Sequence, residues 1–185
     1  MKFFDLLLFR IVSAFSIIPN IESCLIALSL VFITGIVCLT LGLPSGFLKI
    51  SKPNLPIHKL ISAAVVCFFF PGVAEELIFR VIPLPHITEN VSINTCLIWV
   101  VLSLFAYVVV HPLNGLTFYK RALPVFTRPV FLVSVSVLGI ACTVSYLQSG
   151  SIWTAVIIHW SIVVSWLFIF NGYQEVNPKK TLRSS

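Results

Sequence analysis

Residues 151–170 read SIWTAVIIHWSIVVSWLFIF, and His159 is the only acidic or basic residue among these twenty. A helix needs about 20 consecutive, mostly apolar residues to cross the roughly 30 Å hydrocarbon core of a bilayer. This stretch meets the requirement in both length and polarity. The sequence therefore predicts a membrane-spanning helix here, with one histidine near its middle.

The rest of the chain has the same character. Of its 185 residues, 58% are hydrophobic and 10% are charged, far below the roughly 25% charged residues of soluble proteins. Further apolar runs of spanning length occupy residues 21–43, 61–82, 95–118 and 130–148. These features predict an all-α, polytopic transmembrane bundle of five to six spans, with no soluble domain.

A sixth span would come from residues 3–18, FFDLLLFRIVSAFSII, but Asp5 and Arg10 interrupt this run. An interfacial amphipathic helix is the alternative. We therefore expect three parts: an N-terminal amphipathic or first transmembrane segment (1–20), a membrane-embedded helical domain (21–172) and a short cytoplasmic tail (173–185).

The basic residues predict the orientation in the membrane, because cytoplasmic loops carry an excess of lysine and arginine. They fall between the first and second spans, between the third and fourth, and after the fifth: Lys49, Lys52, Lys59; Lys120, Arg121, Arg128; Lys179, Lys180, Arg183. These loops and the C-terminus are expected to be cytoplasmic, in a prokaryotic plasma (inner) membrane. This bias and contact with membrane lipid account for the net charge of +6, so no nucleic-acid partner is expected.

Residues 73–80, VAEELIFR, place three charges inside an apolar run. The twelve Leu, Ile, Val and Phe residues between Ile61 and Ile82 favour insertion by roughly 5 kcal/mol, whereas unpaired charges cost about 2.5 to 3.5 kcal/mol each. Glu76 and Arg80 lie four residues apart on one helical face and can pair. The Pro71-Gly72 dipeptide predicts a break that makes VAEELIFR a separate short helix.

Glu75 is rotated about 100° from Glu76 and has no basic residue three or four positions away. An unpaired carboxyl group in a water-accessible pocket is a candidate general base. His111 and His159 also fall within predicted spans, and together with Glu75 they indicate a hydrolytic centre, a proton path or an ion site. A purely structural charge network between helices is the alternative. His86, in a loop, is expected to be solvated.

The five cysteines all fall within predicted spans, without a C-x-x-C spacing. They are interpreted as small buried apolar residues and not as a disulfide framework or zinc site. No cofactor is expected. The metal alternative is a zinc ion held by Glu75, His111 and His159.

Three motifs occur in order: EELIFR at 75–80, YVVVH at 107–111, and His159 opening a further motif. Together they resemble the CAAX protease and bacteriocin-processing family, which includes type II CAAX prenyl endopeptidases. The resemblance covers about residues 60–170. It implies a glutamic intramembrane protease with an all-helical core.

By this resemblance, Glu75 and His111 would activate water and His159 would stabilise the oxyanion. Glu76 and Arg80 would be supporting residues.

Two positions depart from the family pattern: Tyr107 stands where phenylalanine is usual, and Val163 where the third motif has asparagine. Valine cannot donate a hydrogen bond, so we expect Tyr107, Asn114 or Ser161 to supply the missing donor.

The resemblance implies hydrolysis of a peptide bond near the bilayer, in a lipidated protein or a peptide precursor. Signatures of other intramembrane proteases, such as H-E-x-x-H or G-x-S-G, are missing from the sequence. The alternative is a catalytically inactive member of the same fold, acting as an immunity or scaffold protein or as a small proton-linked carrier. Oligomeric state is left open.

Overall fold

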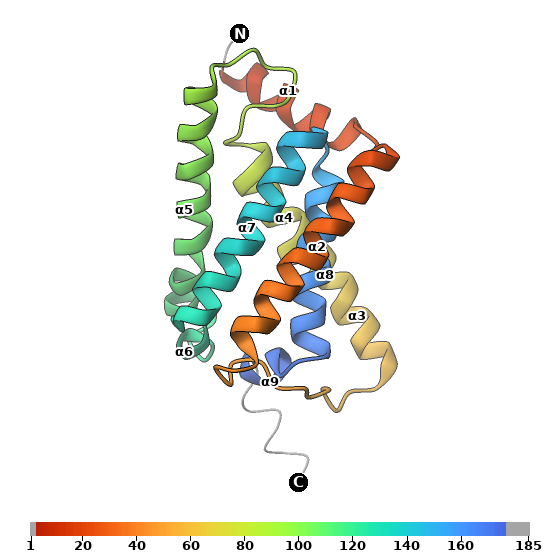
Figure 1. Ribbon diagram of the computed structural model, residues 1–185, viewed down its shortest axis with the longest axis vertical. Helices are drawn as coiled ribbons and strands as arrows, with labels where there is room; N and C mark the ends of the chain where they lie inside the picture. Colours follow the sequence, from red (N-terminus) through yellow and green to blue (C-terminus); the bar gives the residue numbers. More distant parts are fainter. Residues whose placement is uncertain (1–2, 177–185) are drawn as a thin grey trace.

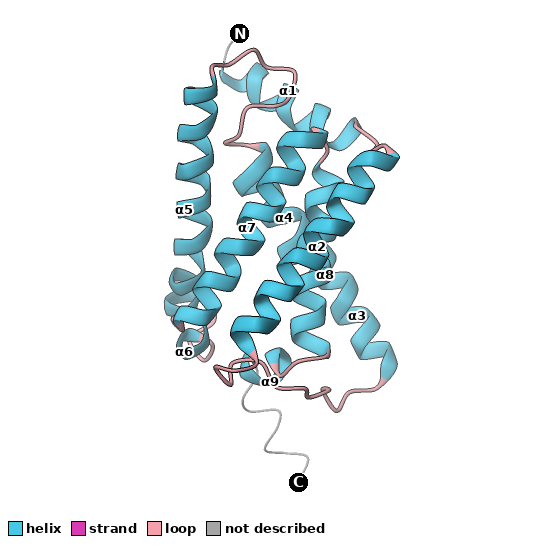
Figure 2. Ribbon diagram, in the orientation of Figure 1, coloured by secondary structure: helices cyan, strands magenta, loops and turns pink. Residues whose placement is uncertain are grey.

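The computed structural model describes residues 3–176, which fold almost entirely as helices (Figure 2). In chain order the elements are α1 (Phe3–Ser16), α2 (Ile21–Gly42), α3 (Ile57–Cys67), η1 (Phe68–Val73), α4 (Ala74–Glu76), η2 (Leu77–Val81), α5 (Ile93–Thr117), α6 (Leu123–Phe126), α7 (Pro129–Ser149), α8 (Ile152–Phe168) and α9 (Gly172–Val176). The predicted all-α bundle is confirmed. Figure 1 shows α2, α5, α7 and α8 running between two ends, with α1 at one end and α9 at the other.

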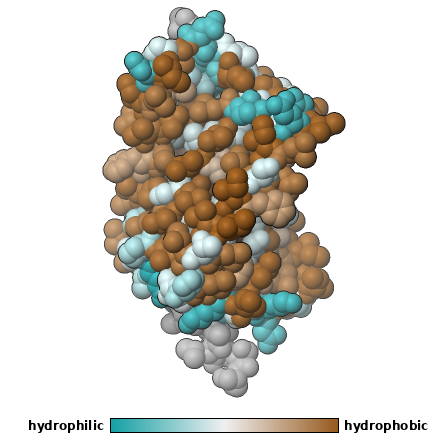
Figure 3. Space-filling model, in the orientation of Figure 1, coloured by the Kyte–Doolittle hydropathy of each residue, from teal (hydrophilic) through white to brown (hydrophobic). Residues whose placement is uncertain are grey.

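Four helical segments of the described chain are long and apolar enough to cross a membrane: Ile21–Gly42, Ile57–Val81, Ile93–Thr117 and Pro129–Ser149. The fifth predicted span is α8, an apolar helix of 17 residues, about 26 Å long. Hydrophobic residues cover most of the visible face between the two ends of the molecule (Figure 3). The protein is an integral membrane protein.

The N-terminal helix α1 has 14 residues and is about 21 Å long, too short to cross a hydrocarbon core of roughly 30 Å by itself. This length favours the interfacial alternative for the segment. Of the expected tail 173–185, residues up to Val176 belong to α9. The remainder, including Lys179, Lys180 and Arg183, lies outside the described residues.

Local signals in the sequence set the helix ends. Asn20 caps α2 by accepting a hydrogen bond from the Ser23 amide at 2.8 Å, and Ser92 caps α5 in the same way. Helix α7 starts with proline at its first position and ends at Gly150, whose φ of +68° is the left-handed conformation that favours glycine. The next helix follows after two residues, Gly150 and Ser151, so α7 and α8 are antiparallel neighbours.

Helices α2, α7 and α8 pack on one another, and α7 and α8 contain most of the buried residues of the three. Its Ile152, Ala155, Val156 and Ile158 have no measurable exposure. His159 lies on the next turn of the same helix and is 1% exposed. The polar site is therefore built against a well packed helix of the bundle.

The predicted span 61–82 is broken near its middle, as expected. Phe70, the residue before Pro71, has φ −134° and ψ 106°, because the proline ring disfavours helical dihedrals in the preceding residue. Helical geometry resumes after the break, and α4 lies between two π-helical segments, η1 and η2. Such segments occur often at functional sites. Glu75 and Glu76 form most of this short helix.

The end of the bundle at α1 is held together by contacts between distant parts of the chain. Arg10 donates two hydrogen bonds to the Glu89 carboxylate, at 2.7 and 2.8 Å, and one to the Ile82 carbonyl at 2.8 Å. The Glu89 carboxylate also accepts from the His86 amide at 2.8 Å. The prediction that His86 is solvated was wrong, because this folded loop leaves it 2% exposed.

At the opposite end, the loop after α2 is joined to the segment after α8. The Lys49 amide donates to Asn171 Oδ1 at 2.8 Å, and the Asn171 amide donates to the Lys49 carbonyl at 2.9 Å. In Figure 1 this loop lies at the same end as α6 and α9. The described basic loops therefore share one end of the bundle.

Candidate active site

The two adjacent glutamates of α4 have different surroundings, because they lie about 100° apart around the helix axis. The Glu76 side chain is fully buried, whereas 19% of the Glu75 side chain is exposed. One carboxylate is thus enclosed in the helix packing, and the other remains partly accessible.

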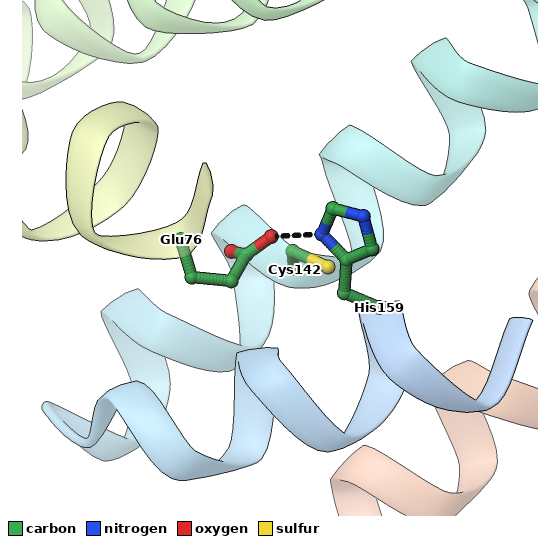
Figure 4. A group of neighbouring side chains, drawn as sticks. All are labelled: Glu76, Cys142 and His159. Atoms are coloured by element: carbon green, nitrogen blue, oxygen red, sulfur yellow. Dashed lines mark hydrogen bonds and ion pairs between the residues drawn. The ribbon is translucent and has the colours of Figure 1, made fainter. Parts of the chain in front are cut away.

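Glu76 is part of a buried network that joins three helices. Its Oε1 lies 3.3 Å from Arg80 Nη1 and 2.6 Å from His159 Nδ1. Figure 4 shows the contact with His159. The other terminal nitrogen of Arg80 donates to the Gly139 carbonyl on α7 at 3.1 Å. The pairing of Glu76 with Arg80 predicted from their spacing is confirmed.

This network fixes which nitrogen of His159 remains available. A carboxylate paired with a guanidinium is ionised and can only accept hydrogen bonds. His159 Nδ1 therefore carries a proton and donates a hydrogen bond to Glu76. Nε2, on the opposite side of the ring, is left for another partner. It lies 3.8 Å from Glu75 Oε2.

The 3.8 Å between His159 Nε2 and Glu75 Oε2 is too long for a direct hydrogen bond, but it is suited to a water molecule that bridges the two atoms. Glu75 Oε2 is shielded from solvent and has no hydrogen-bond partner among the described residues. The His159 ring thus lies between the two carboxylates: Glu76 fixes its Nδ1, and Glu75 faces its Nε2.

Tyr107 fills the space between the two histidines. Its ring centroid lies 5.0 Å from that of His111 and 6.1 Å from that of His159, and the Arg80 guanidinium carbon is 4.2 Å from the same centroid. One turn along α5, His111 Nδ1 donates to the Tyr107 carbonyl at 2.8 Å. His111 Nε2 is therefore the nitrogen that can accept a proton.

The described structure does not join all seven predicted site residues directly. No hydrogen bond or ion pair links Glu75 to His111 within the described chain. Helix α5 continues past Pro112 to Thr117, and the described contacts do not link the Asn114 side chain to the other six residues.

Cys142 on α7 is the neighbour that the sequence interpretation missed. Donor atoms of Glu76, Cys142 and His159 lie within 4.8 Å of one another, and all three residues are buried (Figure 4). Cys142 belongs to the small-residue face of α7 together with Gly139 and Ser145, which is the only sequence signal for its position. The interpretation of all five cysteines as buried was wrong for Cys24, which is exposed.

These donors differ from the predicted zinc set, because Glu76 replaces Glu75 and Cys142 replaces His111. Carboxylate, thiolate and imidazole are all zinc ligands. However, Oε1 of Glu76 already accepts hydrogen bonds from both Arg80 and His159. The positive charge of the adjacent guanidinium also disfavours a divalent cation here. The arrangement is better suited to holding His159 than to holding a metal ion.

The fold and these contacts define a polytopic, all-helical membrane protein with a buried glutamate–histidine site. A family model described as Type II CAAX prenyl endopeptidase Rce1-like matches residues 57–165. This match covers more than half of the chain, from α3 into α8, and the chain belongs to this family. Neither a curated protein nor a solved structure matches the chain.

Proposed function

We propose that the protein is an intramembrane endopeptidase that hydrolyses a peptide bond near the bilayer surface. The substrate is a lipidated protein or a peptide precursor. One observation carries the proposal: His159 is fixed through Nδ1 by Glu76, while its Nε2 faces the unpartnered Oε2 of Glu75 at 3.8 Å. Membership of an endopeptidase family supports it.

In the proposed reaction, Glu75 is the general base. It accepts a proton from a water molecule while the water oxygen attacks the carbonyl carbon of the peptide bond. The carbonyl electron pair moves onto the carbonyl oxygen, which becomes an oxyanion. His111 assists through its Nε2, the nitrogen not engaged with the Tyr107 carbonyl.

The intermediate then collapses. The oxyanion electron pair re-forms the carbonyl group, the carbon–nitrogen bond breaks, and the proton held by Glu75 passes to the leaving amine. His159 stabilises the oxyanion by donating from Nε2 in its imidazolium form. Glu76 stabilises that form through Nδ1 and holds the ring in place.

Arg80 and Glu76 are positioning residues in this account. The Arg80 guanidinium lies 3.3 Å from the Glu76 carboxylate and keeps it ionised. It also donates a hydrogen bond to the Gly139 carbonyl, which links η2 to α7. We further propose that the end carrying the described basic loops faces the cytoplasm of a prokaryotic cell.

The test is cleavage of a fluorogenic peptide panel, prenylated and plain, by purified protein in detergent with a chelator present. The variants are Glu75→Gln and, as a matched control, Glu22→Gln at an exposed glutamate on α2. We expect wild type and Glu22→Gln to cleave in chelator, and Glu75→Gln to lose at least about 100-fold in rate. Cleavage by Glu75→Gln at the wild-type rate would contradict the assignment of the base.

A second candidate function is binding without catalysis. The observation that favours it is Val163, which follows His159 by one turn and offers no hydrogen-bond donor. This candidate predicts no turnover of any peptide under any condition, together with unchanged stability of Glu75→Gln.

A further inference from the structure

Peptide hydrolysis needs a hydrogen-bond donor where the oxyanion develops, and a missing donor costs about 10² to 10³ in rate. Position 163 lies one turn beyond His159, and its valine side chain supplies no donor. The Cys142 thiol donates to the Ala155 carbonyl, and the two terminal nitrogens of Arg80 donate to Glu76 and to the Gly139 carbonyl, whereas Arg80 Nε has no partner among the described residues. Two buried donors of the site are thus without a described partner: Arg80 Nε and the Tyr107 hydroxyl.

Tyr107 has an unused donor at this place. The residue is 0% exposed, and its hydroxyl has no hydrogen-bond partner among the described residues. Burying a polar group without a partner destabilises the folded state, so such a hydroxyl calls for an explanation. Phenylalanine would fill the same space without this penalty.

The Tyr107 ring packs among the side chains of the site. The Arg80 guanidinium lies over the ring at 4.2 Å, and the two histidine rings lie 5.0 and 6.1 Å away. On α7, Gly139 permits this close approach, because a Cβ atom there would lie 2.9 Å from Tyr107 Cδ1.

We propose that the Tyr107 hydroxyl donates a hydrogen bond to the oxygen of the scissile carbonyl as that oxygen becomes an oxyanion. It acts together with His159 Nε2 and replaces the donor absent at Val163. No proton is transferred, so Tyr107 stabilises charge and does not act as an acid. This role rests on the proposed endopeptidase function.

The principal variant is Tyr107→Phe, which keeps the ring, its stacking on Arg80 and its contacts with both histidines. The matched control is Tyr146→Phe, because Tyr146 on α7 is 1% exposed and its hydroxyl also lacks a described partner. Tyr146 lies against His86, at the α1 end of the bundle. Both variants remove one buried hydroxyl, but only one of these hydroxyls belongs to the site.

We expect Tyr107→Phe to lower kcat between tenfold and a thousandfold, with KM within about threefold, because the donor acts only in the transition state. Tyr146→Phe is expected to stay within threefold of wild type in both constants. Adding Val163→Asn to Tyr107→Phe should restore kcat at least tenfold. A purely structural role of Tyr107 predicts neither the selective loss of kcat nor the rescue.

The outcomes separate this role from the proposed function. If wild type cleaves peptides and Tyr107→Phe retains kcat within threefold, the role of Tyr107 is overturned while the endopeptidase stands. If wild type cleaves nothing, the endopeptidase proposal fails and the role of Tyr107 fails with it.

Val163→Asn in the otherwise wild-type protein is a second test, independent of the folding of Tyr107→Phe. If Tyr107 already supplies the donor, kcat does not rise. A tenfold rise would show that a donor had been missing and would overturn the role of Tyr107.

Discussion

Replacing Arg80 with methionine tests whether the buried network holds the bundle together. Arg80 is 1% exposed, and its removal leaves the fully buried Glu76 carboxylate without its 3.3 Å partner. It also removes the hydrogen bond to the Gly139 carbonyl and the contact with the Tyr107 ring. These three losses affect three separate parts of the chain: α4, α7 and α5.

Breaking a buried ion pair by removing one partner costs about 3 to 5 kcal/mol. His159 still donates to Glu76 at 2.6 Å in the variant, which offsets part of this loss. The lost bond to Gly139 adds about 1 kcal/mol. We therefore expect Arg80→Met to lower the free energy of unfolding by about 4 kcal/mol.

The assay is SDS titration in mixed micelles, followed by circular dichroism. The matched control is Arg128→Met, because Arg128 forms a partly exposed pair with Glu175 at 3.8 Å. Exposed pairs contribute about 0 to 1 kcal/mol, so this variant should remain close to wild type. The double variant Glu76→Gln/Arg80→Met should lose less than Arg80→Met alone, because no buried charge is left unpaired. A loss below about 1 kcal/mol for Arg80→Met would refute this reasoning.

Three further predictions concern other contacts. Gly139→Leu should lower the free energy of unfolding by about 1 to 3 kcal/mol in the same titration and reduce turnover. The reason is that a Cβ atom at this position would lie 2.7 Å from Leu104 and 2.9 Å from Tyr107. Unchanged stability would contradict this close packing around Gly139. Glu76→Gln should also lower the free energy of unfolding, whereas Glu75→Gln should change it by less than about 1 kcal/mol, because only Glu76 is fully buried and hydrogen-bonded. Equal losses of stability in the two variants would contradict the different surroundings of the two acids. Partial burial alone would raise the pKa of Glu89, but its hydrogen bonds with Arg10 and the His86 amide hold that pKa below the ordinary value of 4.5. The folded state then binds fewer protons than the unfolded state, so the contact between Glu89 and Arg10 stabilises the protein above about pH 4.5, and this stabilisation is lost as the pH falls below that value. Arg10→Ala should therefore weaken the pH dependence of the free energy of unfolding in the SDS titration. An unchanged pH dependence would count against the Glu89–Arg10 contact.

Most of the helical framework could be predicted because span length and apolarity are physical requirements of the bilayer. The runs predicted at 21–43, 95–118 and 130–148 became α2, α5 and α7 with ends within two residues. Proline also predicted the break in the charged span, since it restricts the residue before it. These features depend on local sequence alone.

The site was predicted only in part, because it depends on contacts across the bundle. The spacing of Glu76 and Arg80 indicated that these two residues pair. It did not indicate that Glu76 Oε1 also accepts a hydrogen bond from His159, which lies 83 residues away in the sequence. Cys142 carried no motif of its own, and only the packing of α7 placed it beside Glu76.

His86 was misjudged for a similar reason. Its loop is folded by Arg10, which is 79 residues distant from Glu89 in sequence. A long-range contact of this kind leaves no periodic signal in the sequence.

The central claim is that Glu75 activates water to hydrolyse a peptide bond. The most direct measurement is cleavage in water enriched in oxygen-18 with a chelator present, followed by mass spectrometry of both products. The account predicts one oxygen-18 atom in the newly formed carboxylate for wild type and almost no product for Glu75→Gln. Equal labelled product from both proteins, or cleavage abolished by the chelator, would contradict it.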